Sequence, residues 1–248
     1  MKRKCWNTRK RVCRSPLGAP YPRRRLKEIN LKIVGRIRMT AMEWYLDLCS
    51  GSKSMKNFCD KRYVSLDIEP KYAPDILTSI LDWDYKSYFA QHGKPVFIWF
   101  SPPCNEYSSL NYARPEKTPD IAGSNAIVRR GLEIINYAGC KFVIENPQTG
   151  TLKKQGILDE IPFTDVDYCQ YDYPYRKRTR LWNNIDFVGK LCERTACPFI
   201  TNGRHQYSIG NSSYKTNVRE IGLKRSRLEQ RYSVPEKLLT EIKEKAGI

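Results

Sequence analysis

The sequence of 248 residues lacks any apolar stretch near eighteen residues, which excludes a membrane-spanning helix. Its basic amino-terminal region also lacks the apolar segment of a signal peptide, so we expect an intracellular protein, cytoplasmic or nuclear. No internal repeat and no long low-complexity segment are present. The chain is 40% hydrophobic and 12% aromatic, which indicates a folded protein with one full core, or one core plus a small accessory unit.

Acidic residues are scarce near the amino terminus. Residues 1–38 hold fourteen lysines or arginines against one acid, Glu28, and so carry +13 of the formal net charge of +18. We therefore expect residues 1–40 to form a basic, flexible arm that contacts a nucleic acid, because phosphate contacts release counterions. Two alternatives stay open: a solvated tail with a nuclear-targeting run at 23–25, and translation that starts at Met39 or Met42.

Regular cysteine spacing is also absent. The nine cysteines are spaced irregularly, which favours free thiols over disulfides in an intracellular protein and allows at most one metal site. Cys49, Cys59 and Cys140 lie in apolar surroundings, and we expect them to be packing residues.

From residue 43 onward, short apolar runs alternate with stretches of helical periodicity. This alternation is typical of an α/β fold in which a mostly parallel sheet carries helices on both faces, and we expect one domain over residues 41–248. The predicted strands are 44–48, 63–68, 96–100, 141–145, 163–169 and a segment near 180–182, and the predicted helices are 53–60, 124–138 and 235–246.

Two of the predicted strands end in residues that carry chemistry. The run 96–100 leads into Ser101-Pro102-Pro103-Cys104, and the run that ends at Ile144 is followed by Glu145-Asn146-Pro147. The carboxyl ends of strands are where an open α/β sheet binds its ligands. A thiol and a carboxyl group at that edge predict nucleophilic catalysis assisted by an acid.

A second set of residues follows the earlier strands. The turn Asp47-Leu48-Cys49-Ser50-Gly51-Ser52 comes after the first strand, and its glycine lets a ligand approach the backbone closely. Asp67 and Glu69 end the next strand, where a carboxylate can accept hydrogen bonds from a ribose diol. Asp82 and Trp83 come at the following junction and could add an acid and an apolar wall for a purine. Their order along one unit predicts a nucleoside-cofactor site.

Together these motifs resemble those of the DNA (cytosine-5)-methyltransferases, from about residue 43 to residue 245. The turn at Asp47 is similar to the first motif of the family, with Lys53 or Ser54 in place of a second glycine. Pro103-Cys104 resembles the catalytic Pro-Cys pair, here followed by Asn105 instead of glutamine, and Glu145-Asn146 resembles the Glu-Asn pair.

Two later segments extend the resemblance. Residues 173–180, Tyr-Pro-Tyr-Arg-Lys-Arg-Thr-Arg, are similar to the Arg-X-Arg motif, and 232–235, Tyr-Ser-Val-Pro, to the final motif without its Gly-Asn. The Glu-Asn-Pro and Tyr-Pro-Tyr forms are similar to those of short, divergent members found in phages and large DNA viruses.

The resemblance implies a Rossmann-like class I fold, S-adenosyl-L-methionine as cofactor and methylation of cytosine C5 in DNA, for restriction, self-protection or regulation. Cys104 would bond to C6 of the base, Glu145 would engage N3, Arg180 would hold the O2 side and orient Glu145, and Arg178 would face phosphate. The expected cofactor contacts are Asp47, Leu48, Cys49, Ser50, Gly51, Asp67, Ile68, Glu69, Asp82, Trp83 and Pro103.

Two further segments have expected roles. The polar stretch 105–123, with Ser108, Ser109, Asn111, Tyr112 and Arg114, would close over a base flipped out of a duplex. Only a reduced insert around 183–231 is available for target recognition, so sequence preference should be short or loose, or come from the arm or a partner.

Cys192, Cys197 and His205 lie in this insert. The spacing Cys-X4-Cys-X7-His is not a standard zinc signature, so we expect a loop with ordinary thiols and no metal. A structural zinc site completed by Cys169 or another group is the alternative.

Three other functions stay open: the same chemistry on RNA, a catalytically silent relative that only binds nucleic acid, and methylation of an exocyclic amine. Ser-Pro-Pro followed by an aromatic residue serves the last chemistry, and Cys104 in that position argues against it. No membrane partner is expected, and the chain is expected to act as a monomer.

Overall fold

The computed structural model describes residues 43–108, 111, 116, 118–207 and 232–248. The arm expected over 1–40, and Ser109, Tyr112 and Arg114 of the expected lid, lie outside the described residues. No helix in the described part of the chain is long and apolar enough to cross a membrane.

Seven strands form one sheet in the order β3-β2-β1-β4-β5-β7-β6. All neighbouring pairs from β3 to β5 are parallel, whereas β7 runs antiparallel to both β5 and β6. The strands are β1 (Trp44–Leu48), β2 (Arg62–Asp67), β3 (Ile76–Leu77), β4 (Phe97–Phe100), β5 (Lys141–Pro147), β6 (Phe163–Asp167) and β7 (Arg178–Asn183).

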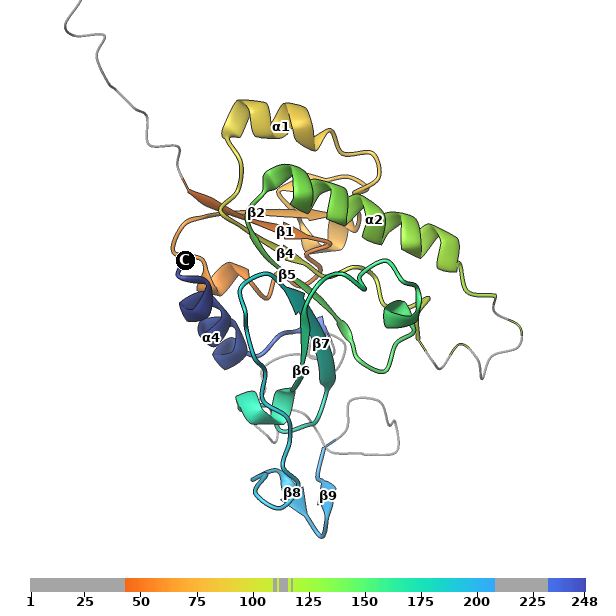
Figure 1. Cartoon of the computed structure of the whole chain (residues 1–248), viewed down its shortest axis with the longest axis vertical. Coiled ribbons are helices and arrows are strands. Elements are labelled where there is room, and N and C mark those ends of the chain that lie inside the picture. Colours follow the sequence, from red (N-terminus) through yellow and green to blue (C-terminus); the bar gives the residue numbers. More distant parts are fainter. Residues whose placement is uncertain (1–42, 109–110, 112–115, 117, 208–231) are drawn as a thin grey trace, which may run out of the picture. The chain divides into compact units, whose positions relative to one another are not determined.

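The side chains of the central strands alternate between two apolar clusters, one on each face of the sheet. On one face, Leu46, Ile98 and Ile144 pack with residues of α1 (Tyr85–His92) and α2 (Ile121–Ala138). On the other face, Tyr45, Phe97 and Val143 pack with α4 (Glu236–Ala246) and the 3-10 turn η5 (Tyr168–Tyr171). Figure 1 shows α1 and α2 on one side of the sheet and α4 on the other. The predicted fold class, a mostly parallel Rossmann-like class I sheet with helices on both faces, is confirmed.

Helix α2 packs closely against the strand that leads to Cys104. Its first turn is capped by Asp120, whose side chain accepts a hydrogen bond of 2.8 Å from the N–H of Gly123. A methyl group added at Gly131 would lie 2.1 Å from a ring carbon of Phe100, the last residue of β4. The absence of a side chain at Gly131 therefore lets the helix approach this strand.

Two expectations for local structure were wrong. The helix expected over 53–60 is only the 3-10 turn η1 (Lys56–Phe58), because Lys53 is left-handed, with φ of 56°, and Cys59 is already extended. The strand expected over 163–169 ends at Asp167, where the chain turns into η5.

The sequence did not predict helix α1, strand β3, or the hairpin of β8 (Ile200–Thr201) and β9 (Arg204–His205). Helix α1 buries only Tyr85 and Phe89, which leaves little periodic signal in its sequence. The hairpin lies inside the reduced insert expected around 183–231, of which residues 208–231 are outside the described part.

Candidate active site at the carboxyl ends of the strands

The residues expected to catalyse the reaction belong to two adjacent parallel strands: Cys104 follows β4, and Glu145 lies in the last part of β5. Phe97 pairs with Lys141 and Phe100 with Ile144, so β4 and β5 end at the same edge of the sheet. The side-chain amide of Asn146 donates a hydrogen bond of 2.9 Å to the carbonyl oxygen of Pro102. This bond links the Pro-Pro turn before the half-buried Cys104 to the residue after Glu145.

Glu145 is buried against two residues of the segment that connects β6 to β7, Tyr168 and Lys177. Only 8% of it is exposed. The hydroxyl of Tyr168 donates a hydrogen bond of 3.4 Å to Oε1, and the ammonium of Lys177 lies 3.5 Å from the same oxygen. Lys177 also lies over the Tyr168 ring, 4.9 Å from its centroid. Lys177 was not among the predicted site residues, although it stands in the basic run just before the Arg-X-Arg motif.

The two arginines of that motif are each held by a carboxylate on β6. Arg178 makes two hydrogen bonds to Asp167, of 3.0 and 2.7 Å, and Arg180 makes two to Asp165, of 2.8 and 3.0 Å. The Arg180 guanidinium also stacks 3.7 Å from the centroid of the Phe163 ring. The structure therefore places Lys177 next to Glu145, and it places Arg180 on β7 opposite Asn146, the residue after Glu145. The roles of Arg178 at phosphate and of Arg180 at the base remain predictions.

The expected cofactor turn has an unusual backbone conformation. Cys49, Gly51 and Lys53 have φ values of 56°, 45° and 56°, which place all three in the left-handed region. Lys53 thus adopts the conformation that a second glycine would favour. Asp67 stabilises the turn, because its two carboxylate oxygens accept hydrogen bonds from the N–H groups of Gly51, at 2.7 Å, and Glu69, at 2.9 Å.

Several polar atoms of this turn are buried without a hydrogen-bond partner, namely Asp47 Oδ1, Ser50 Oγ and Ser52 Oγ. The other carboxylate oxygen of Asp47 accepts a hydrogen bond of 2.6 Å from Tyr63. Burial raises the pKa of Asp47 to about 7, with the nearby Asp67 charge adding to the effect. Buried polar atoms are rarely left unpaired in native structures, so this turn is suited to a ligand that brings hydrogen-bond donors.

The remaining predicted cofactor residues differ in exposure. Ile68, Glu69, Asp82 and Pro103 are exposed, whereas Leu48 is fully buried. Trp83 is 6% exposed and packs edge-on against Phe89, 5.8 Å between ring centroids, so it lies in the core beneath Asp82.

The final motif lies beside the cofactor turn. The N–H of Val234 donates a hydrogen bond of 3.2 Å to Ser54 Oγ, across 180 positions of sequence. Ser233 Oγ is 3.0 Å from the hydroxyl of Tyr173, which begins the segment before the Arg-X-Arg motif. Three motifs that are far apart in the chain therefore meet near one edge of the sheet.

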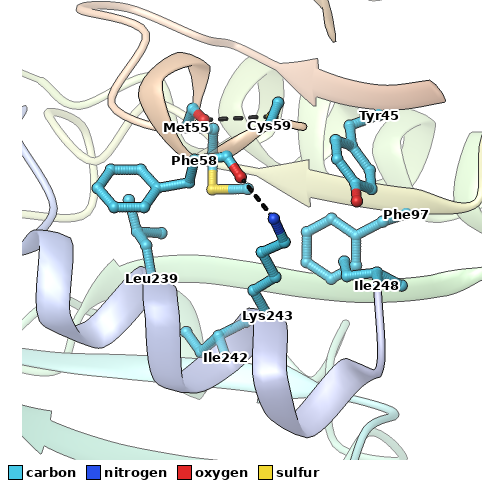
Figure 2. Close-up of a pocket in the computed structure, with 9 residues that line it drawn as sticks. All are labelled: Tyr45, Met55, Phe58, Cys59, Phe97, Leu239, Ile242, Lys243 and Ile248. Atoms are coloured by element: carbon cyan, nitrogen blue, oxygen red, sulfur yellow. Dashed lines mark hydrogen bonds between the residues drawn. The ribbon is translucent and has the colours of Figure 1, made fainter. Parts of the chain in front are cut away.

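An apolar pocket lies elsewhere, beneath α4. Figure 2 shows Tyr45 and Phe97 from the sheet, Phe58 from η1, and Leu239 and Ile242 from α4 around it. Tyr45 and Phe97 stand near the amino ends of β1 and β4, the ends opposite to those where α/β sheets bind ligands. We interpret this pocket as a packing gap between α4 and the sheet.

No disulfide joins any of the cysteines in the described part of the chain, and Cys59 and Cys140 are half-buried. The structure brings together the three candidate metal ligands of the insert, Cys192, Cys197 and His205, and adds Cys169 to them.

Comparison with protein-family models finds no match. A "Probable DNA (cytosine-5)-methyltransferase" of Frog virus 3 (isolate Goorha) is 34% identical over 218 residues, covering 79% of this chain and 97% of that protein. The solved structure of a DNMT2 E260A/E261A/K263A mutant from Spodoptera frugiperda matches with a TM-score of 0.41 and 16% identity over 61% of this chain. This chain spans 56% of the length of that solved chain. The identity to the viral protein over nearly its whole length shows that the chain belongs to the DNA (cytosine-5)-methyltransferase family.

Proposed function

We propose that this chain transfers a methyl group from S-adenosyl-L-methionine to C5 of cytosine in DNA, through a covalent bond between Cys104 and C6 of the base. The observation that carries the proposal is the adjacency of β4 and β5, with Asn146 bonded to Pro102 between the two strand ends. This arrangement supports a nucleophile and an acid that act on one pyrimidine ring.

The order of steps follows from the electronic structure of cytosine. The Cys104 thiolate adds to C6, and the electron pair of the C5–C6 double bond moves toward C5 and N3. Glu145 engages N3 and offsets the charge that develops there. C5 takes the methyl group, a base removes the C5 proton, and the restored double bond expels the thiolate. A base in a duplex must leave its stack to reach such a pocket.

The residues of the cofactor turn suit this cofactor. S-adenosyl-L-methionine, when bound, supplies an electrophilic methyl group on a sulfonium. Asp47 and the hydroxyls of Ser50 and Ser52 would receive its amino-acid part, because their buried oxygens lack partners. The exposed Glu69 would accept hydrogen bonds from the ribose, and the exposed Asp82 would face the adenine.

A transfer assay with labelled S-adenosyl-L-methionine tests the proposal. Wild-type protein should label DNA, and Cys104→Ser should lower the rate at least about a thousand-fold, because the nucleophile is lost. Cys140→Ser is the matched control, since it makes the same change at a half-buried thiol near the amino end of β5 and should keep the wild-type rate. Undiminished transfer by Cys104→Ser would disprove the thiol mechanism and favour an exocyclic amine.

A covalent trap and a cofactor-binding measurement distinguish the other functions. DNA that carries 5-fluorocytosine should trap a covalent complex with wild-type protein and not with Cys104→Ser, because fluorine at C5 cannot leave as a proton does. Trapping on RNA alone would reassign the substrate. A chain that binds nucleic acid but does not bind S-adenosyl-L-methionine would be a silent relative.

A further inference from the structure

Four potential metal ligands converge beyond the sheet, away from the cofactor turn. They are Cys169 in η5, Cys192 and Cys197 in the loop after β7, and His205 in β9, and their ligand atoms all lie within 4.8 Å of one another. The Sγ atoms of Cys192 and Cys197 are each 3.5 Å from Nε2 of His205. The residues come from three separate segments, so the convergence is a property of the tertiary fold.

The two sulfur–nitrogen separations match a tetrahedral zinc centre. With Zn–S bonds of about 2.3 Å and Zn–N bonds of about 2.0 Å, tetrahedral geometry separates the ligand atoms by roughly 3.5 to 3.8 Å. The two S···N distances of 3.5 Å therefore already suit a shared metal ion. Three thiols and one imidazole form a borderline-soft donor set, which Zn²⁺ prefers over Mg²⁺ or Ca²⁺.

A disulfide explains the cluster less completely than a zinc ion does. Three sulfurs converge, so one disulfide would leave the third thiol and the imidazole without a role. All three are free thiols, and Cys169 and Cys197 are only 3% and 6% exposed.

The local backbone is arranged to present these ligands. Asn202 and Gly203, with φ of 53° and 72°, form the tight turn that pairs Ile200 with His205. The N–H of Ile200 donates a hydrogen bond of 3.2 Å to the carbonyl of Cys197, so that Cys197 and His205 face the same point. The N–H of Cys192 donates a hydrogen bond of 2.9 Å to Asp167, which orients this ligand from outside.

The hairpin itself is small, and the described chain just after it is joined to Tyr175 by a single bridge at Tyr207. Each of its strands has two residues, and a pair of such strands is not stable alone in water. A zinc ion with three thiolates and a neutral imidazole carries a net charge of −1, which the nearby guanidinium groups of Arg176 and Arg194 would offset.

We propose that Cys169, Cys192, Cys197 and His205 bind one structural Zn²⁺ that fixes the β8–β9 hairpin to the end of β6. All four positions are filled by protein, which is the mark of a structural rather than a catalytic zinc. Through Asp167, the same centre is linked to Arg178 of the Arg-X-Arg motif. The zinc would therefore support the reduced recognition insert without taking part in methyl transfer.

Metal analysis of the full-length protein, purified with zinc supplied, tests this site directly. Wild-type protein should hold about one zinc per chain, and Cys197→Ser should lose most of it. Cys140→Ser, a half-buried thiol outside the cluster, should keep the wild-type content. Protein without zinc, full zinc retention in Cys197→Ser, or a disulfide among the three cysteines would each overturn the proposal.

Two measurements on wild-type protein keep the test valid if Cys197→Ser fails to fold. Replacement of zinc by Co²⁺ should give visible bands of tetrahedral cobalt and sulfur-to-cobalt charge-transfer bands in the near ultraviolet. A chelator should accelerate trypsin cleavage after Arg194 and Arg204, and added zinc should reverse the effect. Octahedral cobalt spectra, or cleavage that a chelator does not change, would contradict a closed site of four protein ligands.

Discussion

Two buried aspartates near the carboxyl ends of strands, Asp47 on β1 and Asp167 on β6, differ in what surrounds them. They are 2% and 0% exposed. Asp167 accepts hydrogen bonds on both oxygens, from Arg176, from Arg178 and from the N–H of Cys192. Asp47 accepts one, from Tyr63, and its other oxygen has no partner.

The two environments shift the pKa values of the carboxyl groups in opposite directions. Burial alone would raise the pKa of Asp167, but hydrogen bonds from Arg178, the Cys192 N–H and Arg176 hold it below its ordinary value of 3.8. Burial raises the pKa of Asp47 from 3.8 to about 7. Asp167 thus completes a structural network within the chain, whereas Asp47 needs a donor from outside. The same substitution at both positions should therefore have opposite consequences.

The largest effect is expected from Asp167→Asn. Loss of the carboxylate leaves Arg176 and Arg178 without their buried acceptor, so the free energy of unfolding should fall by about 3 kcal/mol. Urea unfolding measures it. Asp172→Asn is the control, because its side chain is 76% exposed and pairs with Lys237 at 3.4 Å, an ion pair that contributes at most about 1 kcal/mol. Equal losses in both variants would contradict a special role for Asp167.

A smaller effect, of opposite character, is expected from Asp47→Asn. At pH 8 the free energy of unfolding should stay the same or rise, because an incompletely paired buried charge is removed. The affinity for S-adenosyl-L-methionine should fall about tenfold or more, because a hydrogen bond to a charged group contributes about 1.5 to 3 kcal/mol. Calorimetric titration measures this affinity. A loss of stability as large as that of Asp167→Asn would show that Asp47 is structural.

A third effect is on the pH dependence of the free energy of unfolding. Between about pH 4 and 7 native Asp47 holds a proton that the unfolded chain releases, so its contribution should lower the free energy of unfolding as pH rises through this window. Asp167 has a lowered pKa, so its contribution is present above 3.8 and is lost as pH falls through its folded pKa.

Urea unfolding from below pH 3.8 up to pH 7, compared between wild type and each Asp→Asn variant, separates the contributions of the two aspartates. If the free energy of unfolding of Asp47→Asn changes with pH between 4 and 7 as it does in wild type, Asp47 is not the source of this pH dependence.

Long apolar runs made the central strands predictable. Trp44–Leu48, Phe97–Phe100 and Lys141–Pro147 all lie where the alternation of runs indicated, because strands buried on both faces are mostly apolar. Helix α2 begins at Ile121, three positions before the predicted start at Ser124, since the capping role of Asp120 carries no periodic signal. The antiparallel direction of β7 depends on its neighbours β5 and β6, and no local pattern indicates it.

In the candidate site too, the sequence predicted some features and missed others. The motifs that contain Cys104, Glu145 and Gly51 were recognisable in the sequence, because each is a short run of unusual residues at or just after the end of a strand. Lys177 beside Glu145 was missed, since a lysine in a basic run resembles any exposed charge. The partners of Arg180 and Arg178, Asp165 and Asp167, were also missed, since these acids lie in a strand whose contribution to the site was not expected.

The sequence by itself determined the α/β class and which reactive residues lie at the ends of which strands, because hydrophobic runs and short motifs are local. Only the tertiary structure decided that Asp47 keeps an unpaired oxygen while Asp167 has none, and that Cys169 joins Cys192, Cys197 and His205. These outcomes depend on packing between segments that are far apart in the chain, and burial there controls both the protonation of a carboxyl group and the distances between potential ligands.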